Sequence, residues 1–335
     1  MKALVCKAFG PPESLVLEEL DDPTPGKDEV LVDIHAAGIN FPDILVFAGK
    51  YQVRTEPPFI PGYEASGVVT ELGDGVQRLA VGDKVIVMPM TGFVRNGTPR
   101  SGGFAEKMAV SERHAFPLPE GMTFEQGAGF PITFCTSYHA LKDVANIQKG
   151  ESLLVLGAAG GVGTTAVEIG KAMGARVIAA ASTDEKLEFA KSVGADETIN
   201  YSHVPIKEAI RALTNGKGAD VVYDPVGGDL AEQALRGTAW QGRYLVVGFA
   251  AGNIPKFPAN LALLKEASIK GVFSGQWAVL NPEKHIQNIR EMTGLLAEGK
   301  IQSRITATYA LEDYVQAYSD VAGRRITGKT VFRIR

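Results

Sequence analysis

A glycine-rich turn between a buried strand and a helix constrains this chain more than any other feature. The apolar run 153–156 leads directly into Gly157-Ala158-Ala159-Gly160-Gly161-Val162-Gly163, and the residues that follow have helical character. Glycines at this spacing allow a tight bend, close approach of the backbone to a pyrophosphate, and close packing of the helix on the strand. The start of the helix offers free N–H groups and its positive dipole end to phosphates. Because a second apolar strand follows at 176–181, the segment predicts a dinucleotide site rather than an ordinary glycine-rich turn.

The composition is that of a globular chain with two domains. The chain has 335 residues, of which 45% are hydrophobic and 21% are charged. Its net charge is −4 and its basic residues are scattered, which argues against nucleic acid or an anionic membrane as a partner. Two cysteines, Cys6 and Cys135, imply no disulfide framework, so we expect a reducing, cytoplasmic location. Lys7 interrupts the N-terminal apolar residues before a signal-length segment forms, and no run could span a bilayer.

The organisation of the chain changes after residues 119–121. Up to about residue 125, short β-prone runs are cut by glycine, proline and aspartate. Beyond that point predicted strands alternate with helices, which favours a parallel sheet covered on both faces. The predicted strands are 153–156, 177–181, 197–200, 219–224, 243–248 and 268–274.

The C-terminal residues do not extend this alternating series. They predict a helix at 285–299, a strand near 305–308, a helix at 311–322 and a last strand at 330–334. We expect these elements to return to the first domain, which would place the ligand in a cleft between two domains. The predicted domains are 1–124 with 275–335 for the first, and 125–274 for the inserted nucleotide domain.

Six segments in a fixed order carry a resemblance to a known family. They are 37–43, 61–69, 102–106, 136–141, 157–163 and 223–228. With them the chain resembles the zinc-independent quinone oxidoreductase (zeta-crystallin-like) group of the medium-chain dehydrogenase/reductase superfamily. The resemblance implies an α/β fold, in which a GroES-like β-rich catalytic domain carries an inserted Rossmann domain with a doubly wound parallel sheet. It also implies hydride transfer from NADPH and a homodimer.

The end of the second predicted strand favours NADPH over NADH. NAD-binding proteins of this type usually place an acidic residue there, whereas Ser182 follows the strand here and Lys186 lies one helical turn later. These two side chains can hold a 2′-phosphate, and Ser182 can also be the N-cap of a Ser-x-x-Glu box with Glu185. Asp184 is the opposing observation, because an inward-turned carboxylate would favour NADH. We expect it to be a solvated residue of the first helical turn.

The resemblance adds contacts that the residues alone would not reveal. Tyr201 follows the third strand, where this group has an adenosine-phosphate contact, and Arg325 matches a near-terminal arginine of similar role. The complete predicted cofactor set is Gly157, Ala159, Gly160, Gly161, Val162, Gly163, Ser182, Lys186, Tyr201, Gly248, Phe249, Phe273 and Arg325.

The residues at the family's zinc positions predict that no metal is bound. Alcohol dehydrogenases of the superfamily ligate zinc through cysteine, histidine or glutamate, and cysteine; the matching positions here are Asn40, Tyr63 and Ile132. Asparagine and tyrosine are poor zinc ligands and isoleucine cannot ligate. Cys135 lies near the third position and is interpreted as a small buried hydrophobe. The histidines show no paired spacing, and we expect structural or surface roles for His35, His114, His139, His203 and His285.

Without zinc, neutral side chains must orient the acceptor and the nicotinamide. The resemblance implies that the catalytic residues are Asn40, Tyr51, Tyr63 and Thr136. Asparagine can bind a substrate oxygen or the nicotinamide ribose, and tyrosine can donate to a developing oxyanion. Tyr51 and Tyr63 could instead stack on a flat ring or belong to the core. We expect Asp43 to fix its loop rather than to titrate in catalysis.

The leading prediction is an NADPH-dependent reductase of quinones or conjugated enones, with direct hydride transfer, no covalent intermediate and no indispensable general acid. One alternative is an enoyl-thioester (acyl-CoA) reductase, for which Arg95, Arg100 and Arg113 would be sparse contacts to the CoA phosphates. The other is a non-catalytic NADPH-binding structural or sensor protein.

We expect residues 268–274 to form an edge strand that pairs with a second copy of the chain, because an exposed apolar edge strand promotes aggregation.

Overall fold

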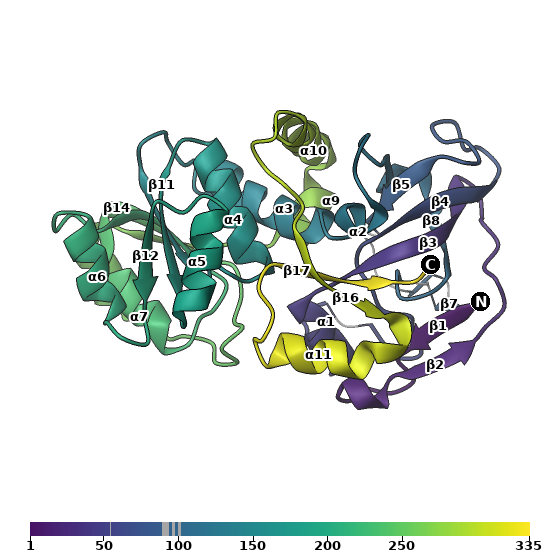
Figure 1. Cartoon of the computed structure of the whole chain (residues 1–335), viewed down its shortest axis with the longest axis horizontal. Coiled ribbons are helices and arrows are strands. Elements are labelled where there is room, and N and C mark those ends of the chain that lie inside the picture. Colours follow the sequence, from purple (N-terminus) through teal and green to yellow (C-terminus); the bar gives the residue numbers. More distant parts are fainter. Residues whose placement is uncertain (54, 89–93, 96–97, 100–101) are drawn as a thin grey trace. The chain divides into compact units, whose positions relative to one another are not determined.

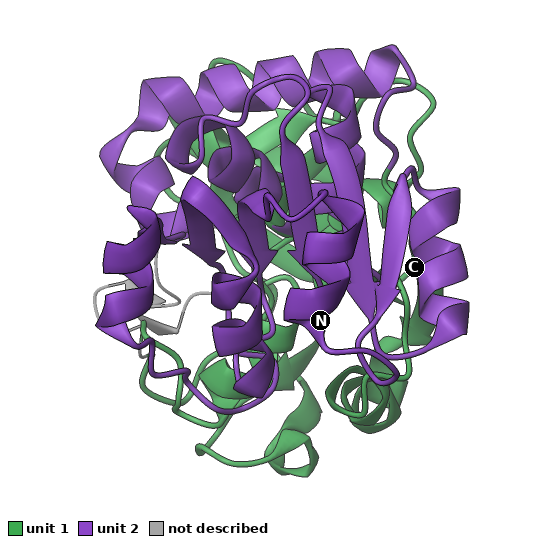
Figure 2. Cartoon of the chain, turned by 90° about the vertical axis from the view of Figure 1, so that its left-hand side faces the viewer, with its two compact units in different colours: residues 1–132, 303–335 green, residues 133–302 purple. Residues whose placement is uncertain are grey.

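The chain folds into two compact units. The structure, a computed structural model, describes residues 1–53, 55–88, 94–95, 98–99 and 102–335, with 94–95 and 98–99 described by their backbone alone. The first unit joins Met1–Ile132 to Ser303–Arg335, and the second is Thr133–Gln302 (Figure 2). One unit is thus inserted into the other, the organisation that the sequence predicts. Within the described residues, no helix combines the length and the apolar character that crossing a membrane requires.

The first unit is built on a seven-stranded sheet that combines strands from residues 29–117 with two strands from the C-terminal residues (Figure 1). Its strand order is β16-β17-β3-β4-β5-β9, and β8 also pairs with β3. The strands are β3 (Glu29–Ile39), β4 (Ala65–Leu72), β5 (Lys84–Val87), β8 (Lys107–Ser111), β9 (Ala115–Pro117), β16 (Ile305–Ala310) and β17 (Lys329–Arg333). Because β17 pairs with the long strand β3, the residues from Ser303 onward return to the first unit, whereas the predicted return begins at residue 275.

Smaller elements complete the first unit. The strands β1 (Lys2–Val5) and β2 (Val16–Glu19) form a two-stranded sheet, and β6 (Val94–Arg95) pairs with β7 (Thr98–Pro99). The helices are α1 (Phe41–Phe47), α2 (Phe124–Ala128) and α11 (Tyr314–Ala322), with short 3-10 turns at Pro12–Ser14, Glu112–His114 and Leu311–Asp313. Aromatic rings from distant segments, including Phe47, Phe104 and Tyr318, are buried together in its core.

The second unit contains a six-stranded parallel sheet of order β12-β11-β10-β13-β14-β15. The strands are β10 (Ser152–Leu156), β11 (Arg176–Ala181), β12 (Glu197–Asn200), β13 (Ala219–Asp224), β14 (Thr238–Val246) and β15 (Ser268–Gly271). The order reverses between β10 and β13, which is the switch point of a doubly wound sheet. Every residue of β10 is buried, as expected for a strand covered on both faces.

Helices of the second unit pack against this sheet or against one another (Figure 1). They are α3 (Pro131–Tyr138), which continues into a π-helix at His139–Val144, α4 (Gly161–Ala172), α5 (Asp184–Ser192), α6 (Ile206–Leu213), α7 (Asp229–Arg236), α8 (Ala259–Lys265), α9 (Ser274–Leu280) and α10 (Pro282–Ala297). The edge strand predicted at 268–274 is present but ends at Gly271, because Ser274 already begins α9.

Contacts of α10 explain why the second unit ends later than the predicted domain 125–274. The Tyr138 hydroxyl donates to Glu291 Oε2 at 2.6 Å, and Lys142 forms an ion pair with the same carboxylate. Lys142 also donates to Asn288 Oδ1 at 2.9 Å. These contacts hold α10 against α3 and the π-helix, so it belongs to the nucleotide unit.

Candidate active site

The glycine-rich turn adopts a conformation that depends on two of its glycines. Gly157, directly after β10, has a positive φ of 58°, which side chains disfavour. A Cβ on Gly163 would lie 2.1 Å from the carbonyl oxygen of Gly157, so the helix can approach the strand only without a side chain there. The N-cap of α4 is Gly160, which has no side chain to cap the first N–H groups. Gly160 is exposed, and Gly161 and Val162 are half-buried. The turn therefore offers uncapped donors to an anion.

The structure corrects the predicted capping at the end of β11. Thr183, not Ser182, is the N-cap of α5, and its hydroxyl accepts the backbone N–H of Lys186 at 3.3 Å. The predicted box of Ser182 with Glu185 is wrong because the extended residue that precedes the helix, at φ −139° and ψ 153°, is Thr183. The correction leaves the Ser182 hydroxyl out of the cap, at the carboxyl end of the strand.

Asp184 is exposed, as predicted, but it has a partner that sequence reasoning missed. The Asn200 side-chain amide donates to Asp184 Oδ1 at 2.7 Å, while Asn200 Oδ1 accepts the N–H of Ser202 at 3.0 Å. The second bond fixes which end of the amide faces Asp184. The carboxylate is therefore held against the end of β12.

The predicted cofactor residues of the second unit gather at one edge of its sheet. Strands of a parallel sheet end on the same side, and five of these strands end just before predicted residues. Gly157 follows β10, Ser182 follows β11, Tyr201 follows β12, Gly248 and Phe249 follow β14, and Phe273 follows β15. Thr136, on α3, lies beside the same region, since its hydroxyl is 2.9 Å from that of Ser274.

Arg325 is the one predicted cofactor residue that lies in the first unit. Its guanidinium donates to Asp320 Oδ1 at 2.7 Å and to the Ser319 hydroxyl at 3.0 Å. Hydrogen bonds from Gln316, Tyr309 and this guanidinium lower the pKa of Asp320 to about 2. The arginine is thus held by a carboxylate that stays ionised at neutral pH.

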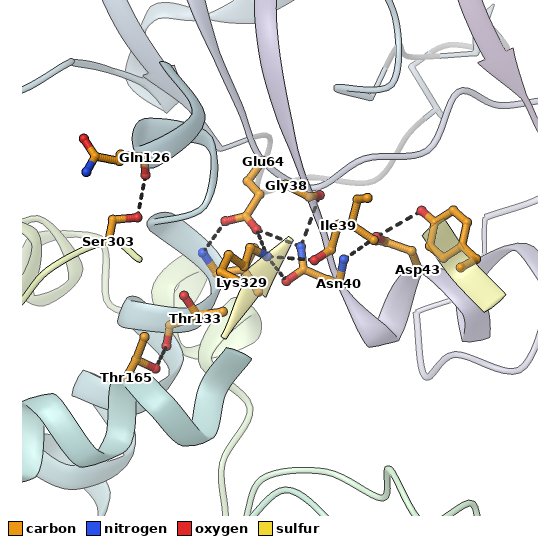
Figure 3. A network of polar contacts seen from close by, with 12 residues as sticks. Gly38, Ile39, Asn40, Asp43, Glu64, Gln126, Thr133, Thr165, Ser303 and Lys329 are labelled. Atoms are coloured by element: carbon orange, nitrogen blue, oxygen red, sulfur yellow. Dashed lines mark hydrogen bonds and ion pairs between the residues drawn. The ribbon is translucent and has the colours of Figure 1, made fainter. Parts of the chain in front are cut away.

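A buried polar network in the first unit surrounds the predicted catalytic residue Asn40 (Figure 3). The Lys329 ammonium donates to Glu64 Oε1 at 2.6 Å, Asn40 Oδ1 at 2.7 Å and the Ile39 carbonyl at 2.9 Å. Asn40 Nδ2 donates to Glu64 Oε1 at 2.8 Å, and the Ile132 N–H donates to Glu64 Oε2 at 2.7 Å. Both polar ends of the Asn40 side chain therefore form hydrogen bonds within the protein, and the side chain links Glu64 to Lys329 in the network.

Sequence reasoning passed over Glu64 and Lys329, although each had a signal. Glu64 stands inside the matched segment 61–69, and Lys329 is a charged residue at the start of an otherwise apolar strand. Their side chains are 0% and 7% exposed. A buried charge requires an ionic partner, so each of them implies the other.

Asp43 lies at the end of this network and is completely buried. Its Oδ2 accepts the Asn40 N–H at 2.7 Å and the Tyr318 hydroxyl at 3.3 Å, which fixes the start of α1 as predicted. Its Oδ1 has no hydrogen-bond partner within the described residues. Burial raises the pKa of Asp43 to about 7, against the lowering effect of the Asn40 N–H and of Lys329. The loop-fixing carboxyl can therefore also titrate near neutral pH.

Tyr51 and Tyr63 lie side by side in the same unit. Their ring centroids are 6.3 Å apart with an angle of 57°, and both residues are half-buried. Burial raises the pKa of each phenol, and the charge of Asp43 raises it further. Both hydroxyls therefore stay protonated at neutral pH and can donate hydrogen bonds.

The positions that match the family's zinc ligands are bound to the protein instead. Asn40 and the backbone of Ile132 both contact Glu64, and Tyr63 packs beside Tyr51. Across the residues that the structure describes, no group of three or more histidine, cysteine, aspartate or glutamate side chains could hold a metal ion.

Two family models match the chain. The model of the alcohol dehydrogenase GroES-like domain matches residues 26–120, and the model of the zinc-binding dehydrogenases matches residues 161–297. The first match falls in the first unit and the second in the nucleotide unit.

Individual proteins resemble the chain over its whole length. Quinone oxidoreductase-like protein 2 of Bos taurus is 37% identical over 335 residues, which covers 100% of this chain and 93% of the relative. The solved Escherichia coli quinone oxidoreductase complexed with NADPH has a TM-score of 0.90 at 27% identity and covers 100% of both chains. A solved NAD-dependent alcohol dehydrogenase has a TM-score of 0.90 at 32% identity, again over 100% of both chains.

Proposed function

We propose that this chain, which belongs to the zinc-independent quinone oxidoreductase group of the medium-chain dehydrogenase/reductase superfamily, transfers hydride from NADPH to quinones or conjugated enones. The observation that carries the proposal is the convergence of predicted cofactor residues at the carboxyl edge of one parallel sheet. That convergence agrees with the quinone oxidoreductase relatives and with the NADPH complex among the structural neighbours.

The residues of the second unit fit NADPH. Gly163 leaves room for backbone approach, and the uncapped start of α4 suits a pyrophosphate. Ser182, which is free of the capping role, lies with Tyr201 where a 2′-phosphate would be held, and Lys186 follows in α5. When bound, NADPH supplies the hydride, while the protein supplies orientation and excludes water.

NADPH rather than NADH is favoured by the position of Asp184. A carboxylate that binds ribose hydroxyls would have to be free to do so, whereas the Asn200 amide holds Asp184 at the end of β12. Because one of the structural neighbours is an NAD-dependent alcohol dehydrogenase, the affinities of this chain for NADPH and NADH should both be measured.

At the acceptor, the phenols of Tyr51 and Tyr63 can donate to the oxygen that becomes negative as hydride arrives. Asn40 acts through the network with Glu64 and Lys329, which fixes the end of β3 and the start of α1. Thr136, on α3, contacts Ser274 and belongs to the cofactor side of the reaction.

The assembly is proposed to be a homodimer formed along β15. This strand pairs only with β14 and is the edge of the described sheet. Large exposed apolar residues occur in α8, β15 and α9, namely Leu263, Leu264, Ile269, Val279 and Leu280. Pairing of two edges about a two-fold axis would cover such a surface. A cytoplasmic location is proposed as well, because a chain with only two cysteines carries no disulfide framework.

A panel of acceptors tests the proposed function. Purified protein should oxidise NADPH with quinones or with conjugated enones, and a deuterated cofactor should slow the chemical step in a single turnover. Faster turnover with an enoyl-CoA than with any quinone would favour the thioester alternative. Of the arginines considered for that alternative, Arg113 is exposed, and the side chains of Arg95 and Arg100 lie outside the described residues. Binding of NADPH without oxidation by any acceptor would contradict a reductase.

A further inference from the structure

One buried side chain joins two loops at the carboxyl edge of the second unit: the first loop, between β13 and α7, and the second loop, between β14 and α8. Asp224, the last residue of β13, is 2% exposed. Its Oδ1 accepts the backbone N–H groups of Val226 at 2.7 Å and Gly227 at 2.8 Å, which fixes the turn of the first loop. Its Oδ2 accepts the hydroxyl of Tyr244, a fully buried residue of β14. The carboxyl group therefore binds the first loop and is itself held by the neighbouring strand.

The backbone of the same residue binds the second loop. The carbonyl oxygen of Asp224 accepts the N–H groups of Val247 at 2.9 Å and Gly248 at 3.3 Å, directly after β14. The two loops are also bonded to each other, since the Ala251 N–H donates to the Val226 carbonyl at 2.8 Å. Asp224 thus links both loops, and one of them carries the predicted cofactor residue Gly248.

The first loop also packs against the glycine-rich turn. A Cβ on Gly157 would lie 2.9 Å from Cγ2 of Val226, and a Cβ on Gly227 would lie 3.1 Å from the ring of Phe249 in the second loop. Both glycines have a positive φ, of 58° and 67°. Because β13 lies between β10 and β14 in the sheet, the first loop is the middle one of three loops in contact. Asp224 fixes the conformation of this middle loop.

The strand order assigns the two loops to one half of a bound dinucleotide. A doubly wound sheet binds the two nucleotide halves on either side of its switch point, and the end of its second strand lies at the adenosine ribose. Here the switch point lies between β10 and β13, with β11 and β12 on one side and β13 and β14 on the other. Ser182 and Tyr201, the predicted contacts of the adenosine phosphate, follow β11 and β12. The first and second loops therefore lie on the nicotinamide side.

We propose that Asp224 is a positioning residue for the nicotinamide half of NADPH, because it holds the first and second loops in the conformation that binds this half. The proposal rests on the proposed reductase function. Alanine at this position would leave the N–H groups of Val226 and Gly227 without their acceptor. Asparagine would preserve the arrangement, since its amide oxygen can accept both N–H groups while its amide nitrogen donates to the Tyr244 oxygen.

Two ligands separate the halves of the site and need no turnover: NADPH, and adenosine 2′,5′-bisphosphate, which carries the 2′-phosphate but no nicotinamide. In titration calorimetry, Asp224→Ala should bind NADPH about ten- to a hundredfold more weakly than wild type, because the binding-competent conformation of the loops is less populated. Its affinity for the bisphosphate should stay within about threefold of wild type, since β11 and β12 are not altered. Asp224→Asn should bind both ligands within about threefold of wild type, because it keeps the hydrogen bonds.

A matched control separates loop positioning from a general loss of stability. Val222→Ala shortens a fully buried side chain of the same strand, two residues before Asp224, and should lower the Tm. Well below its Tm, this control should bind both ligands as wild type does. Hydrogen exchange measured by mass spectrometry adds a second readout on the cofactor-free protein. Peptides that cover the first and second loops should exchange faster in Asp224→Ala, whereas peptides of β11 and β12 should be little changed.

A second variant keeps the test valid if Asp224→Ala does not fold. Tyr244→Phe removes the donor to Oδ2 and leaves both bonds to Oδ1, so NADPH affinity should fall by about threefold to tenfold with no change for the bisphosphate. Equal losses for both ligands, or no loss of NADPH affinity, in the variants that fold would overturn the proposal and leave the reductase function standing. The same holds if Asp224→Asn or Val222→Ala binds NADPH as weakly as Asp224→Ala. If wild-type protein does not bind NADPH, the proposed function itself is contradicted.

Discussion

Replacement of Lys329 by methionine is the sharpest test of the buried network. The methionine fills most of the space of the lysine stem but removes the ammonium, so Glu64 would remain as a charge with 0% exposure and no cation. The Ile39 carbonyl and Asn40 Oδ1 would each lose a donor as well. Removal of one partner from a buried pair typically costs about 3–5 kcal/mol, because the other charge is left uncompensated.

Hydrogen exchange measured by mass spectrometry can localise this cost. Both tryptophans that could report by fluorescence, Trp240 and Trp277, lie in the second unit, whereas the network lies in the first. Peptides that cover β3 and β17 should exchange roughly a hundred- to several-thousand-fold faster in Lys329→Met, since about 1.4 kcal/mol corresponds to tenfold. Peptides from β10 and β13 should be little changed.

Two further variants separate charge from packing. Lys329→Met/Glu64→Gln removes the orphaned charge while the glutamine oxygen can still accept the Ile132 N–H, so exchange should return towards the wild-type rate. Lys2→Met breaks an exposed pair with Glu312 and should leave exchange nearly unchanged. If Lys329→Met exchanges within threefold of wild type in β3 and β17, the network does not stabilise the unit. If the double variant is as labile as the single one, the uncompensated charge is not the cause.

Four other predictions follow from the site and the fold. Lys186→Ala should weaken NADPH binding about ten- to a hundredfold and leave NADH binding nearly unchanged, as titration calorimetry can show; equal losses would refute the phosphate role. Purified protein should contain no stoichiometric zinc and should stay active after exhaustive chelation, and one zinc per chain by elemental analysis would contradict this. Sedimentation at micromolar concentration should show a dimer, whereas a single 35.6 kDa species would exclude it. Burial raises the pKa of Asp43 from 3.8 to about 7, so the stability that its protonated form contributes is full below about pH 4 and is lost as the pH rises to about 7. The Tm of wild type should therefore fall over this pH range relative to the Tm of Asp43→Asn. Parallel curves of Tm against pH for the two proteins would refute the raised pKa.

Much of the nucleotide unit could be predicted because its signals are local. Each strand is an apolar run next to a turn, and parallel strands end on one side, so residues as far apart as Gly157 and Phe273 could be assigned to one edge. The sequence does not specify the cap of α5, because two neighbouring hydroxyl residues, Ser182 and Thr183, both suit the role. Only the backbone angles decide between them.

The parts that could not be predicted depend on distant pairing. Glu64 and Lys329 meet only because β17 returns to β3, and nothing in the local sequence of either residue specifies the other. The predicted end of the second unit at residue 274 is too early for the same reason, since α10 is held by contacts between Glu291 and residues of α3 and the π-helix. The raised pKa of Asp43 results from complete burial, and the position of this residue at the start of a seven-residue helix does not predict such burial.

The return of β17 to the centre of the first sheet has a consequence for biosynthesis. A ribosome releases residues 133–302 as one continuous stretch, so the nucleotide unit can fold while translation continues. The first unit cannot complete its fold at that stage. Until Lys329 has left the exit tunnel, β3 lacks its neighbour β17 and Glu64 lacks its cation. For most of synthesis, the sheet of the first unit is therefore incomplete and Glu64 has no lysine with which to pair. A premature stop that removes only 303–335 would leave the second unit whole and deprive the first of its last two strands.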